Sequence, residues 1–474
     1  MVHQLEYVQS MDRFIFMEKW CVHMMGILKE HSKDDPIREC GLDLAFLETK
    51  PRNLRDAANE KLQVFPFKDV RDCWKRLYTD ACIGVALVHL RTHLQVNRYE
   101  EMLEAWVENV VNALDMAIIM TGAPRREKMI EEMLQQIEAY VVAILPDTTE
   151  RREVEIPDTF PPASTRVPYL EFPVPKSRMT PVPFRDHIKM ESITPFVSTN
   201  NLADWPALHS SRPWSNPNSL LARTFDGRRF VPVELGMSYT SSDFSQNIMT
   251  FADFMAEYLL KPQPEKLGYL AQHDIFSQVP ALKEDIRLPF FCSVKPPFPQ
   301  PGNPLYAKYE TGKVPALKSP LISAWLGPAG TISPLHTDPY HNILCQVHGK
   351  KYIRLYAPGE TPKMYPRGVD SEGVDMSNTS RIPAEMVEMY LEIDMGTAEE
   401  NEVEELIVGE VPNFAAEEEE EDGEHDEQEA FPLFRQAKYM ETVLNEGECL
   451  YIPVGWWHYV RSLEVSISVS FWWN

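Results

Sequence analysis

Three potential metal ligands in the C-terminal half are the feature that most constrains this chain. His336 and Asp338 stand two residues apart in the run TISPLHTDPYHNILCQVHGKKYIRLY, and His458 follows 122 residues after His336 in CLYIPVGWWHYVRSLEVSISVSFWW. Residues two apart on a β-strand point to the same face, so the first two can hold one ion together. Two imidazoles and one carboxylate form the facial triad of non-haem Fe(II) oxygenases, which leaves positions open for other ligands. We therefore predict a catalytic metal site at His336, Asp338 and His458.

The strings around these ligands resemble a known family. TISPLHTDPYHNILCQVHGKKYIRLYAP and YIPVGWWHYVRSLEVSISVSFWWN are similar to the JmjC oxygenases, and more narrowly to the jumonji domain-containing protein 5 group. YLAQHDIFSQVPALKEDI and VPVELGMSYT match the same group. The resemblance covers roughly residues 185–474, apart from an insert near 382–434, and is loose over residues 1–150. It implies a double-stranded β-helix, the cupin-like jelly roll, and an enzyme that uses Fe(II), 2-oxoglutarate and O2.

The cosubstrate gives roles to further residues. The far carboxylate of 2-oxoglutarate needs a cation in a mostly dry pocket, because an unpaired buried charge is costly. Lys351, at the start of the aromatic strand KYIRLY, is our candidate for that cation. The resemblance implies that Asn342, Tyr239 and Ser333 hydrogen-bond the cosubstrate. Trp325, just before a Gly-Pro turn, is expected to line the mouth where the substrate enters.

The resemblance implies oxidation of a substrate C–H bond, and the group is associated with both arginyl hydroxylation and histone-lysine demethylation. The metal triplet has Asp rather than Glu, which is typical of hydroxylases among JmjC proteins. The chain also lacks a zinc-binding Cys/His cluster or a reader domain of the kind many chromatin demethylases carry. We therefore predict an arginyl hydroxylase acting on a basic protein or peptide substrate, with a lysine demethylase as the alternative.

Two other classes remain open. Three N/O ligands around an open position also describe catalytic zinc, but a zinc hydrolase has no need of Lys351 with Asn342. A non-enzymatic interaction protein, working through its helices and an acidic loop, is the other alternative. A barrel kept only as a relic would be expected to lose a metal ligand, and here all three are present.

The net charge of −25 is concentrated in one stretch of the chain. Twenty Asp and Glu residues and no Lys or Arg lie between Ile382 and Phe434, and the remainder carries a net charge of −5. Such a composition cannot bury enough apolar surface to fold. We expect a disordered acidic insert at about 395–430, placed on the surface between barrel strands. No broad basic face of the kind that binds nucleic acid is evident, so no direct nucleic-acid binding is expected.

Other compositional features indicate an intracellular protein, nuclear or cytoplasmic. No run of about 18 uncharged apolar residues predicts a membrane span, and the start MVHQLEYVQSMDRFIF lacks the pattern of a signal peptide. The seven cysteines show no CxxC pairing. Cys21, Cys40, Cys73 and Cys82 are expected to be small core residues of a reduced protein. The sequence does not indicate the oligomeric state.

The chain divides into three regions of an α+β protein. Residues 1–147 are expected to form a helical domain, because apolar residues recur at three- and four-residue spacing. Residues 148–190 are expected to be a proline-rich linker, with eight prolines between Pro157 and Pro183. Residues 191–474 are expected to form the JmjC catalytic domain of short strands and Gly/Pro turns. The expected helices run from 5 to 29, from 70 to 94, from 98 through 114, onward from 124, near 250–260 and near 266–276.

Overall fold

The structure is a computed structural model. It describes residues 2–64, 66–96, 103–144, 156–162, 167–236, 244–262, 264–370, 373–394 and 431–474. These residues form two compact units. The helical unit comprises Met1–Pro157, Leu220–Pro232 and Ile248–Asp253. The barrel unit comprises Asp158–Ser219, Val233–Asn247 and Phe254–Asn474. Two segments that we expected in the catalytic domain therefore belong to the helical unit.

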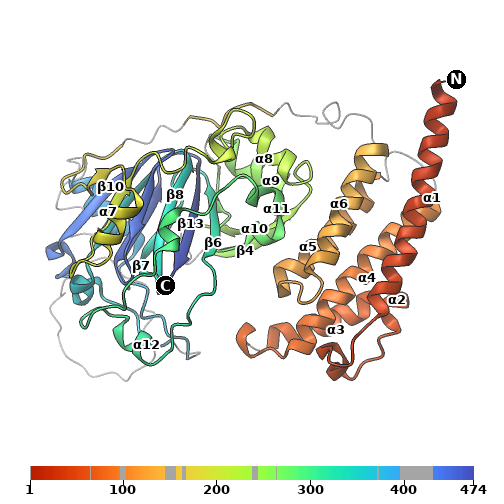
Figure 1. The fold of residues 1–474 in the computed structure, drawn as a ribbon, viewed down its shortest axis with the longest axis horizontal. Helices are drawn as coiled ribbons and strands as arrows, with labels where there is room; N and C mark the ends of the chain where they lie inside the picture. The colour runs from red at the N-terminus through yellow and green to blue at the C-terminus, as the bar shows by residue number, and fades with distance from the viewer. Residues whose placement is uncertain are drawn as a thin grey trace, which may run out of the picture. The chain divides into compact units, whose positions relative to one another are not determined.

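The helical unit is built around one long central helix (Figure 1). Its elements are α1 (Val2–Lys29), η1 (Pro36–Cys40), α2 (Phe46–Thr49), α3 (Pro51–Val64), η2 (Phe67–Asp69), α4 (Asp72–Val96), α5 (Leu103–Thr121) and α6 (Glu127–Ile144). Helix α4 packs against α1, α3 and α5. A Cβ at Gly84 of α4 would lie 2.6 Å from the Leu47 carbonyl oxygen, so only glycine permits this close approach. The helical domain is thus organised around the helix expected at 70–94.

The four helices expected in this region are confirmed, whereas α3 was not predicted. The expected start of the third helix at Arg98 lies outside the described residues. Helix α3 buries residues at three- and four-residue spacing, so the signal was present in the sequence and was missed; these residues are Pro51, Leu54, Ala58 and Leu62.

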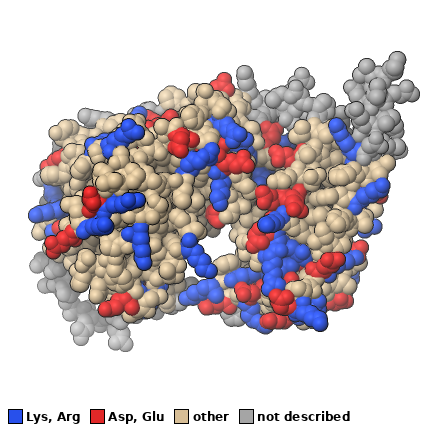
Figure 2. All heavy atoms as spheres, viewed as in Figure 1, with Lys and Arg blue, Asp and Glu red and all other residues tan. Residues whose placement is uncertain are grey.

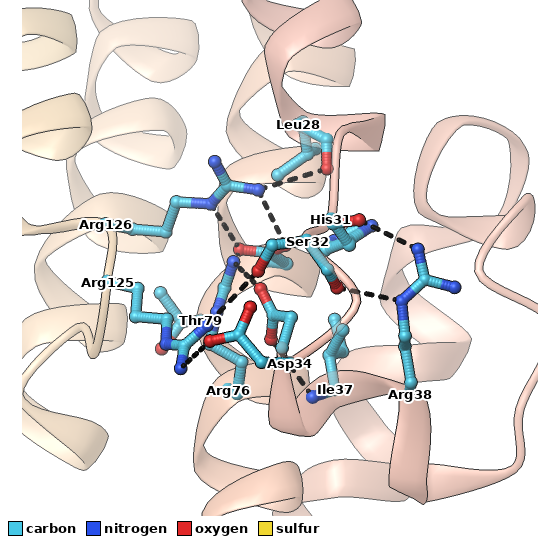
Figure 3. Close-up of polar contacts among 12 residues, drawn as sticks. Leu28, His31, Ser32, Asp34, Ile37, Arg38, Arg76, Thr79, Arg125 and Arg126 are labelled. Atoms are coloured by element: carbon cyan, nitrogen blue, oxygen red, sulfur yellow. Dashed lines mark hydrogen bonds and ion pairs between the residues drawn. The ribbon is translucent and has the colours of Figure 1, made fainter.

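A buried ion cluster, which we define as His31, Asp35, Arg76, Asp80 and Arg126, ties four elements of the helical unit together (Figure 3). Asp80 accepts hydrogen bonds from His31 Nε2 at 2.8 Å, from Arg126 Nε at 3.0 Å and from Arg76. Arg76 also donates to Asp35 at 3.3 Å. Burial opposes ionisation of Asp80, but hydrogen bonds from His31 and Arg126 and the charge of Arg76 outweigh it and lower its pKa.

The barrel unit consists of two facing sheets and a smaller third one (Figure 1). The first has the strand order β1-β2-β11-β8-β13-β6, the second β10-β9-β12-β7 and the third β4-β3-β5. The strands are β1 (Lys176–Ser177), β2 (Phe196–Ser198), β3 (Phe230–Leu235), β4 (Ser245–Thr250), β5 (Gly268–Tyr269), β6 (Leu321–Gly327), β7 (Ile332–Thr337), β8 (His341–His348), β9 (Lys351–Tyr356), β10 (Tyr439–Leu444), β11 (Cys449–Ile452), β12 (Trp457–Ser462) and β13 (Ser466–Trp473). Strand β1 pairs with β2 in parallel over two residues. The pairs β10–β9, β11–β2, β11–β8, β12–β7, β12–β9, β13–β6, β13–β8 and β3–β5 are antiparallel.

Side chains alternate between the interior of the barrel and its outer surface. Interior residues of the two large sheets pack into one apolar cluster, which includes Leu344, Ile353, Leu355, Leu450, Ile452 and Val460. The opposite face of the four-stranded sheet packs against α13 and neighbouring turns, and that cluster includes Tyr352, Tyr356, Met386, Val387, Trp457 and Tyr459. The cupin-like jelly roll predicted from the strand pattern and the resemblance is confirmed.

Short helices and turns connect these strands. They are α7 (Pro181–His187), η5 (Pro206–Leu208), α8 (Pro217–Arg223), α9 (Phe251–Phe254), η6 (Met255–Leu259), α10 (Ile275–Gln278), α11 (Pro280–Lys283), η7 (Phe290–Ser293), α12 (Tyr306–Glu310), η8 (Pro358–Met364), α13 (Ala384–Asp394) and η9 (Phe434–Gln436). Two of them, α8 and α9, lie mostly in segments of the helical unit. The helical stretch expected near 250–260 is present as α9 and η6. The one expected near 266–276 is wrong over most of its length, because β5 occupies its start.

Part of the expected linker is built into the barrel unit. Strand β1 pairs in parallel with β2, and the Val174 amide donates to the Glu441 carbonyl at 2.8 Å. Val174 is also buried in the interior cluster. We call residues 173–177 the strap. Prolines are tolerated in it, because an edge segment leaves alternate N–H groups without ladder partners.

Three expectations concerned the acidic insert, the charge of the surface and membrane-spanning helices. The acidic insert expected at about 395–430 lies outside the described residues. On the face shown in Figure 2, acidic and basic side chains are interspersed, and the described residues there form no broad basic surface. Among the described helices, none is both long and apolar enough to cross a membrane.

Candidate metal centre and active site

Strands β7 and β12 bring the first and third predicted ligands together. The two strands are antiparallel, His336 lies directly opposite His458, and the centroids of the two rings are 4.1 Å apart. The register then shifts by one residue before Val460 pairs with Ser333. Pro334 lies in this irregularity and has no N–H to give to the ladder. Its carbonyl instead faces His336 Nδ1 at 2.7 Å.

The three ligand side chains converge on one point. Asp338 follows the last residue of β7, and its Oδ1 and Oδ2 lie 3.8 Å from His336 Nε2 and 3.7 Å from His458 Nε2. His458 Nδ1 faces the Trp456 carbonyl at 3.1 Å. Since both Nδ1 atoms face backbone carbonyls, the two Nε2 atoms are left for a metal. All ligand atoms lie within 4.8 Å of one another, so the predicted triad is assembled.

Two features of the surroundings suit a bound divalent cation. Burial, together with the neighbouring His336, lowers the pKa of His458 to about 4, so its imidazole is neutral as a ligand must be. Trp472 Nε1 donates to Asp338 Oδ2 at 2.7 Å and fixes the orientation of the carboxylate. Trp472 was not predicted as a site residue, although it lies in the quoted ending SFWWN.

An inner pocket behind the triad contains a buried lysine. Lys351 is only 2% exposed, and its Nζ donates to the Tyr269 hydroxyl at 3.0 Å. Burial lowers the pKa of Lys351 to about 7. Asn342 lines the same pocket, and its buried Oδ1 has no hydrogen-bond partner among the described residues. Its NH2 group donates to Asp338 Oδ2 at 3.4 Å.

These groups fit the cosubstrate that the resemblance implies. Among the described residues Lys351 has no carboxylate partner, so a dicarboxylate would supply one, and the Asn342 amide and Tyr269 hydroxyl can hydrogen-bond carboxylate oxygens. Ser333 lines the same pocket and hydrogen-bonds Tyr269. Tyr239 lies outside the described residues, and the tyrosine that the structure places beside Lys351 is Tyr269. Tyr269 begins the string YLAQHDIFSQVPALKEDI, so the sequence contained the signal.

Most of the predicted residues share this pocket. Those that line it are Trp325, Ser333, His336, Asp338, Asn342, Lys351 and His458.

An outer cleft of about 700 Å³ opens beside the triad. His336, Asp338 and Trp325 line it, and Trp325 Nε1 donates to Ser470 Oγ at 3.0 Å. The other lining residues used below are Glu234, Phe244, Gln246, Tyr269, Tyr340 and Trp472.

Glu234 is a carboxylate of this cleft that the sequence analysis missed. It lies on β3 opposite Tyr269 of β5, and burial raises its pKa to about 7. Among the described residues that line the cleft there is no lysine or arginine. Glu234 belongs to the quoted string VPVELGMSYT, but it was not proposed as a site residue. The cleft therefore presents a desolvated acidic group to whatever enters it.

Comparisons with known proteins agree with this geometry. A family described as a cupin-like domain matches residues 182–474. Lysine-specific demethylase 8 of Danio rerio is 31% identical over 97% of this chain and 95% of its own length. Jumonji C domain-containing protein 5 of Drosophila melanogaster is 37% identical over 60% of this chain and 55% of its own length. Lysine-specific demethylase JMJ30 of Arabidopsis thaliana is 32% identical over 89% of this chain and 84% of its own length.

Proposed function

Because this chain belongs to the cupin-like JmjC family of Fe(II)- and 2-oxoglutarate-dependent oxygenases, in the jumonji domain-containing protein 5 group, we propose that it hydroxylates an arginine side chain in a protein or peptide. The observation that carries this choice of substrate is the acidic cleft beside the triad. The membership supports oxygenase chemistry, while the choice between hydroxylation and demethylation depends on what the cleft accepts.

Glu234 is the group that we propose selects a cationic substrate. A carboxylate whose pKa is raised by burial gains from a cationic partner, because pairing restores the charged form. A guanidinium pairs with a carboxylate through two parallel hydrogen bonds and stacks on aromatic rings. Phe244, Trp325 and Tyr340 line the same cleft and offer such rings.

The inner pocket is proposed to hold the cosubstrate. Lys351 would pair with the far carboxylate of 2-oxoglutarate, and Asn342, Ser333 and Tyr269 would hydrogen-bond it. Tyr239 remains a further prediction for this role. The buried position of Lys351 keeps water from competing with the carboxylate for its ammonium group.

His336, Asp338 and His458 would hold Fe(II) between this pocket and the cleft. The bound metal and 2-oxoglutarate supply an oxidant that inserts one oxygen atom of O2 into a substrate C–H bond, with succinate and carbon dioxide as by-products. Trp472 orients the Asp338 carboxylate, and the carbonyls of Pro334 and Trp456 keep both imidazoles in the tautomer that binds metal. The remaining contribution of the protein is to place a substrate carbon beside this centre.

Demethylation is the second candidate, because two of the relatives are named lysine-specific demethylases. A methylated ammonium is bound best within a cage of aromatic rings. Tyr269, Trp325 and Trp472 lie near the triad, but they contact one another in tilted and T-shaped pairs, with centroids 6.0 and 6.2 Å apart. These three rings therefore form no cage among themselves, and the preference for arginine rests on the Glu234 carboxylate.

Matched peptides test the proposal. Peptides that carry arginine, lysine or dimethyl-lysine at one position are incubated with the full chain, Fe(II), ascorbate and 2-oxoglutarate, and the products are identified by mass spectrometry. We expect a gain of one oxygen on the arginine peptide alone. Loss of methyl and release of formaldehyde from the dimethyl-lysine peptide, with arginine unchanged, would establish the demethylase instead.

A substitution in the cleft tests the role of Glu234. Glu234→Gln should lower kcat/KM for the arginine peptide about 10- to 100-fold, because a hydrogen bond to a charged group contributes about 1.5–3 kcal/mol. Gln246→Ala removes a polar side chain that lines the same cleft but no charge, and should change it little. Equal losses in the two variants would show that the charge of Glu234 does not select the substrate.

A further inference from the structure

Two strands of the barrel repeat one short pattern. Strand β9 begins Lys351-Tyr352-Ile353-Arg354, and β12 contains His458-Tyr459-Val460-Arg461. In each case a proposed functional residue comes first and lines the inner pocket, as does Val460 on β12, while Ile353 on β9 packs in the interior cluster. The tyrosine and arginine alternate with these residues and therefore point to the opposite face of the sheet.

On β12 the outward pair is bound by a glutamate of α13. Glu388 accepts a hydrogen bond from the Tyr459 hydroxyl, and it forms an ion pair with Arg461, whose Nη1 lies 2.7 Å from Glu388 Oε2. We call these three residues the β12 clamp. Tyr459 is fully buried, and it lies where the register between β12 and β7 shifts. The clamp therefore holds β12 beside His458, where its ladder with β7 is interrupted.

On β9 the outward pair is bound by a glutamate of β10. Glu441 accepts from the Tyr352 hydroxyl, and Arg354 Nη2 lies 3.3 Å from Glu441 Oε2. Arg354 Nε also donates to the Tyr352 hydroxyl at 2.8 Å. We call these three residues the β9 clamp; all are at least 96% buried. This clamp holds the strand on which Lys351 is the first residue.

The two clamps face each other across the β9–β12 ladder. Tyr459 lies opposite Arg354, and Arg461 lies opposite Tyr352. The outer surface behind His458 and Lys351 therefore carries two neighbouring clamps. Glu388 of α13 binds the Tyr459 and Arg461 side chains of β12, and Glu441 of β10 binds the Tyr352 and Arg354 side chains of β9.

We infer that Glu388 and Glu441 are positioning residues with separate targets: Glu388 places His458 at the metal, and Glu441 places Lys351 at the cosubstrate. The inference rests on the proposed roles of His458 and Lys351. Side chains that hydrogen-bond or hold a metal ligand without touching the metal typically contribute to affinity or activity. Their removal lowers metal affinity or activity about 10- to 100-fold. A residue that only stabilised the barrel would affect both binding events alike.

The test measures two affinities in the full chain. Co(II) is used as the metal probe, and its visible absorption reports both binding and coordination geometry. Binding of 2-oxoglutarate to the Co(II)-loaded protein is measured by calorimetry. Glu388→Gln and Glu441→Gln are close in size to the natural residues, and Tyr459→Phe and Tyr352→Phe remove only the hydroxyl of each clamp. The tyrosine variants decide the matter if a glutamine variant fails to fold.

We expect a crossed result. Glu388→Gln and Tyr459→Phe should weaken Co(II) binding about tenfold and alter its absorption, with 2-oxoglutarate affinity of the loaded protein retained. Glu441→Gln and Tyr352→Phe should weaken 2-oxoglutarate binding about tenfold, with Co(II) binding retained. Equal losses of both affinities in all variants, or no loss in any, would overturn the inference.

Two reference variants separate this inference from the proposed function. His458→Ala should abolish Co(II) binding and Lys351→Ala should abolish 2-oxoglutarate binding at ordinary concentrations. If either reference variant binds normally, the proposed role of that residue is wrong. If both behave as expected while the glutamate variants do not show the crossed result, only the positioning inference fails.

Discussion

Both units bury charged side chains, but they treat them in opposite ways. In the ion cluster of the helical unit, Asp80 is fully buried and bound by Arg76, Arg126 and His31. In the barrel unit, Lys351 is almost as deeply buried, yet its ammonium group donates a hydrogen bond to the neutral hydroxyl of Tyr269. The first arrangement compensates its charges within the protein, whereas the second would be compensated by the cosubstrate that we propose binds there.

This difference separates structural from functional charge. A buried charge is tolerated when partners nearby satisfy it, and removal of one partner then costs stability. A buried charge without an ionic partner lowers stability in the free protein and is recovered on binding, which is how binding sites are built. The directions of the pKa shifts agree: partners lower the pKa of Asp80 despite its burial, and burial alone lowers that of Lys351.

The largest effect is expected at the metal centre. Asp338→Ala removes the only carboxylate of the triad and should reduce succinate release below detection, because two imidazoles alone do not complete the facial site. Circular dichroism should remain that of the natural protein. Asp375→Ala, at an exposed carboxylate that pairs with Lys308, is the control and should keep its turnover. Full activity in the Asp338 variant would remove the metal assignment.

The next largest effect is expected in the ion cluster. Asp80→Ala leaves two arginines and a histidine buried without their shared partner, so it should lower the free energy of unfolding by about 3–5 kcal/mol. Urea denaturation of the full chain measures this. Asp34→Ala removes an exposed carboxylate paired with Arg125 and should leave the free energy of unfolding nearly unchanged, because solvent screens an exposed ion pair. Similar losses in the two variants would mean that burial does not distinguish these pairs.

A kinetic effect of similar origin is expected at Lys351. Lys351→Ala should raise KM for 2-oxoglutarate at least about 100-fold, because a buried anion loses its partner at a cost of about 3–5 kcal/mol. Lys350→Ala is the matched control, since Lys350 is partly exposed and pairs with Glu464 at 2.7 Å. An equal rise in both variants would refute the assignment of Lys351.

The smallest effect has the opposite sign. Lys351→Met should stabilise the free protein, because it removes a buried ammonium group that has no carboxylate partner among the described residues. The pKa of Lys351 is about 7 in the folded chain and about 10.4 when unfolded. The unfolded state thus binds more protons between these values, and the natural protein gains stability as pH rises through this window. The advantage of the variant should be largest at or below about pH 7 and vanish near pH 10 in urea denaturation. A destabilised variant at pH 7 would show that Lys351 is compensated within the protein.

Much of the catalytic site could be predicted from local sequence. The two-residue spacing of His336 and Asp338 fixes a shared face on a strand, and the strings around Lys351 and His458 resemble a family whose site is known. Three of the four long helices of the first region were readable from their apolar spacing. These features depend on neighbours in the sequence, so a single chain reveals them.

Other parts of the site depend on distant segments. Glu234, Tyr269 and Trp472 come from three different strands, and nothing in the local pattern around Glu234 shows that it will line a cleft. The proline-rich strap looked like a linker, because a few residues of edge pairing leave no periodic signal. Likewise, residues 220–232 joined the helical unit through contacts such as the ion pair of Arg229 with Asp115.

By itself, the sequence determined which residues could bind a metal and which strands would carry them, since side-chain chemistry and the two-residue strand period are local properties. Only the tertiary structure decided that the Lys351 ammonium would be buried beside a tyrosine hydroxyl while the Asp80 carboxylate would be bound by two arginines. The physical reason is that desolvation and charge pairing depend on which distant segments surround a group.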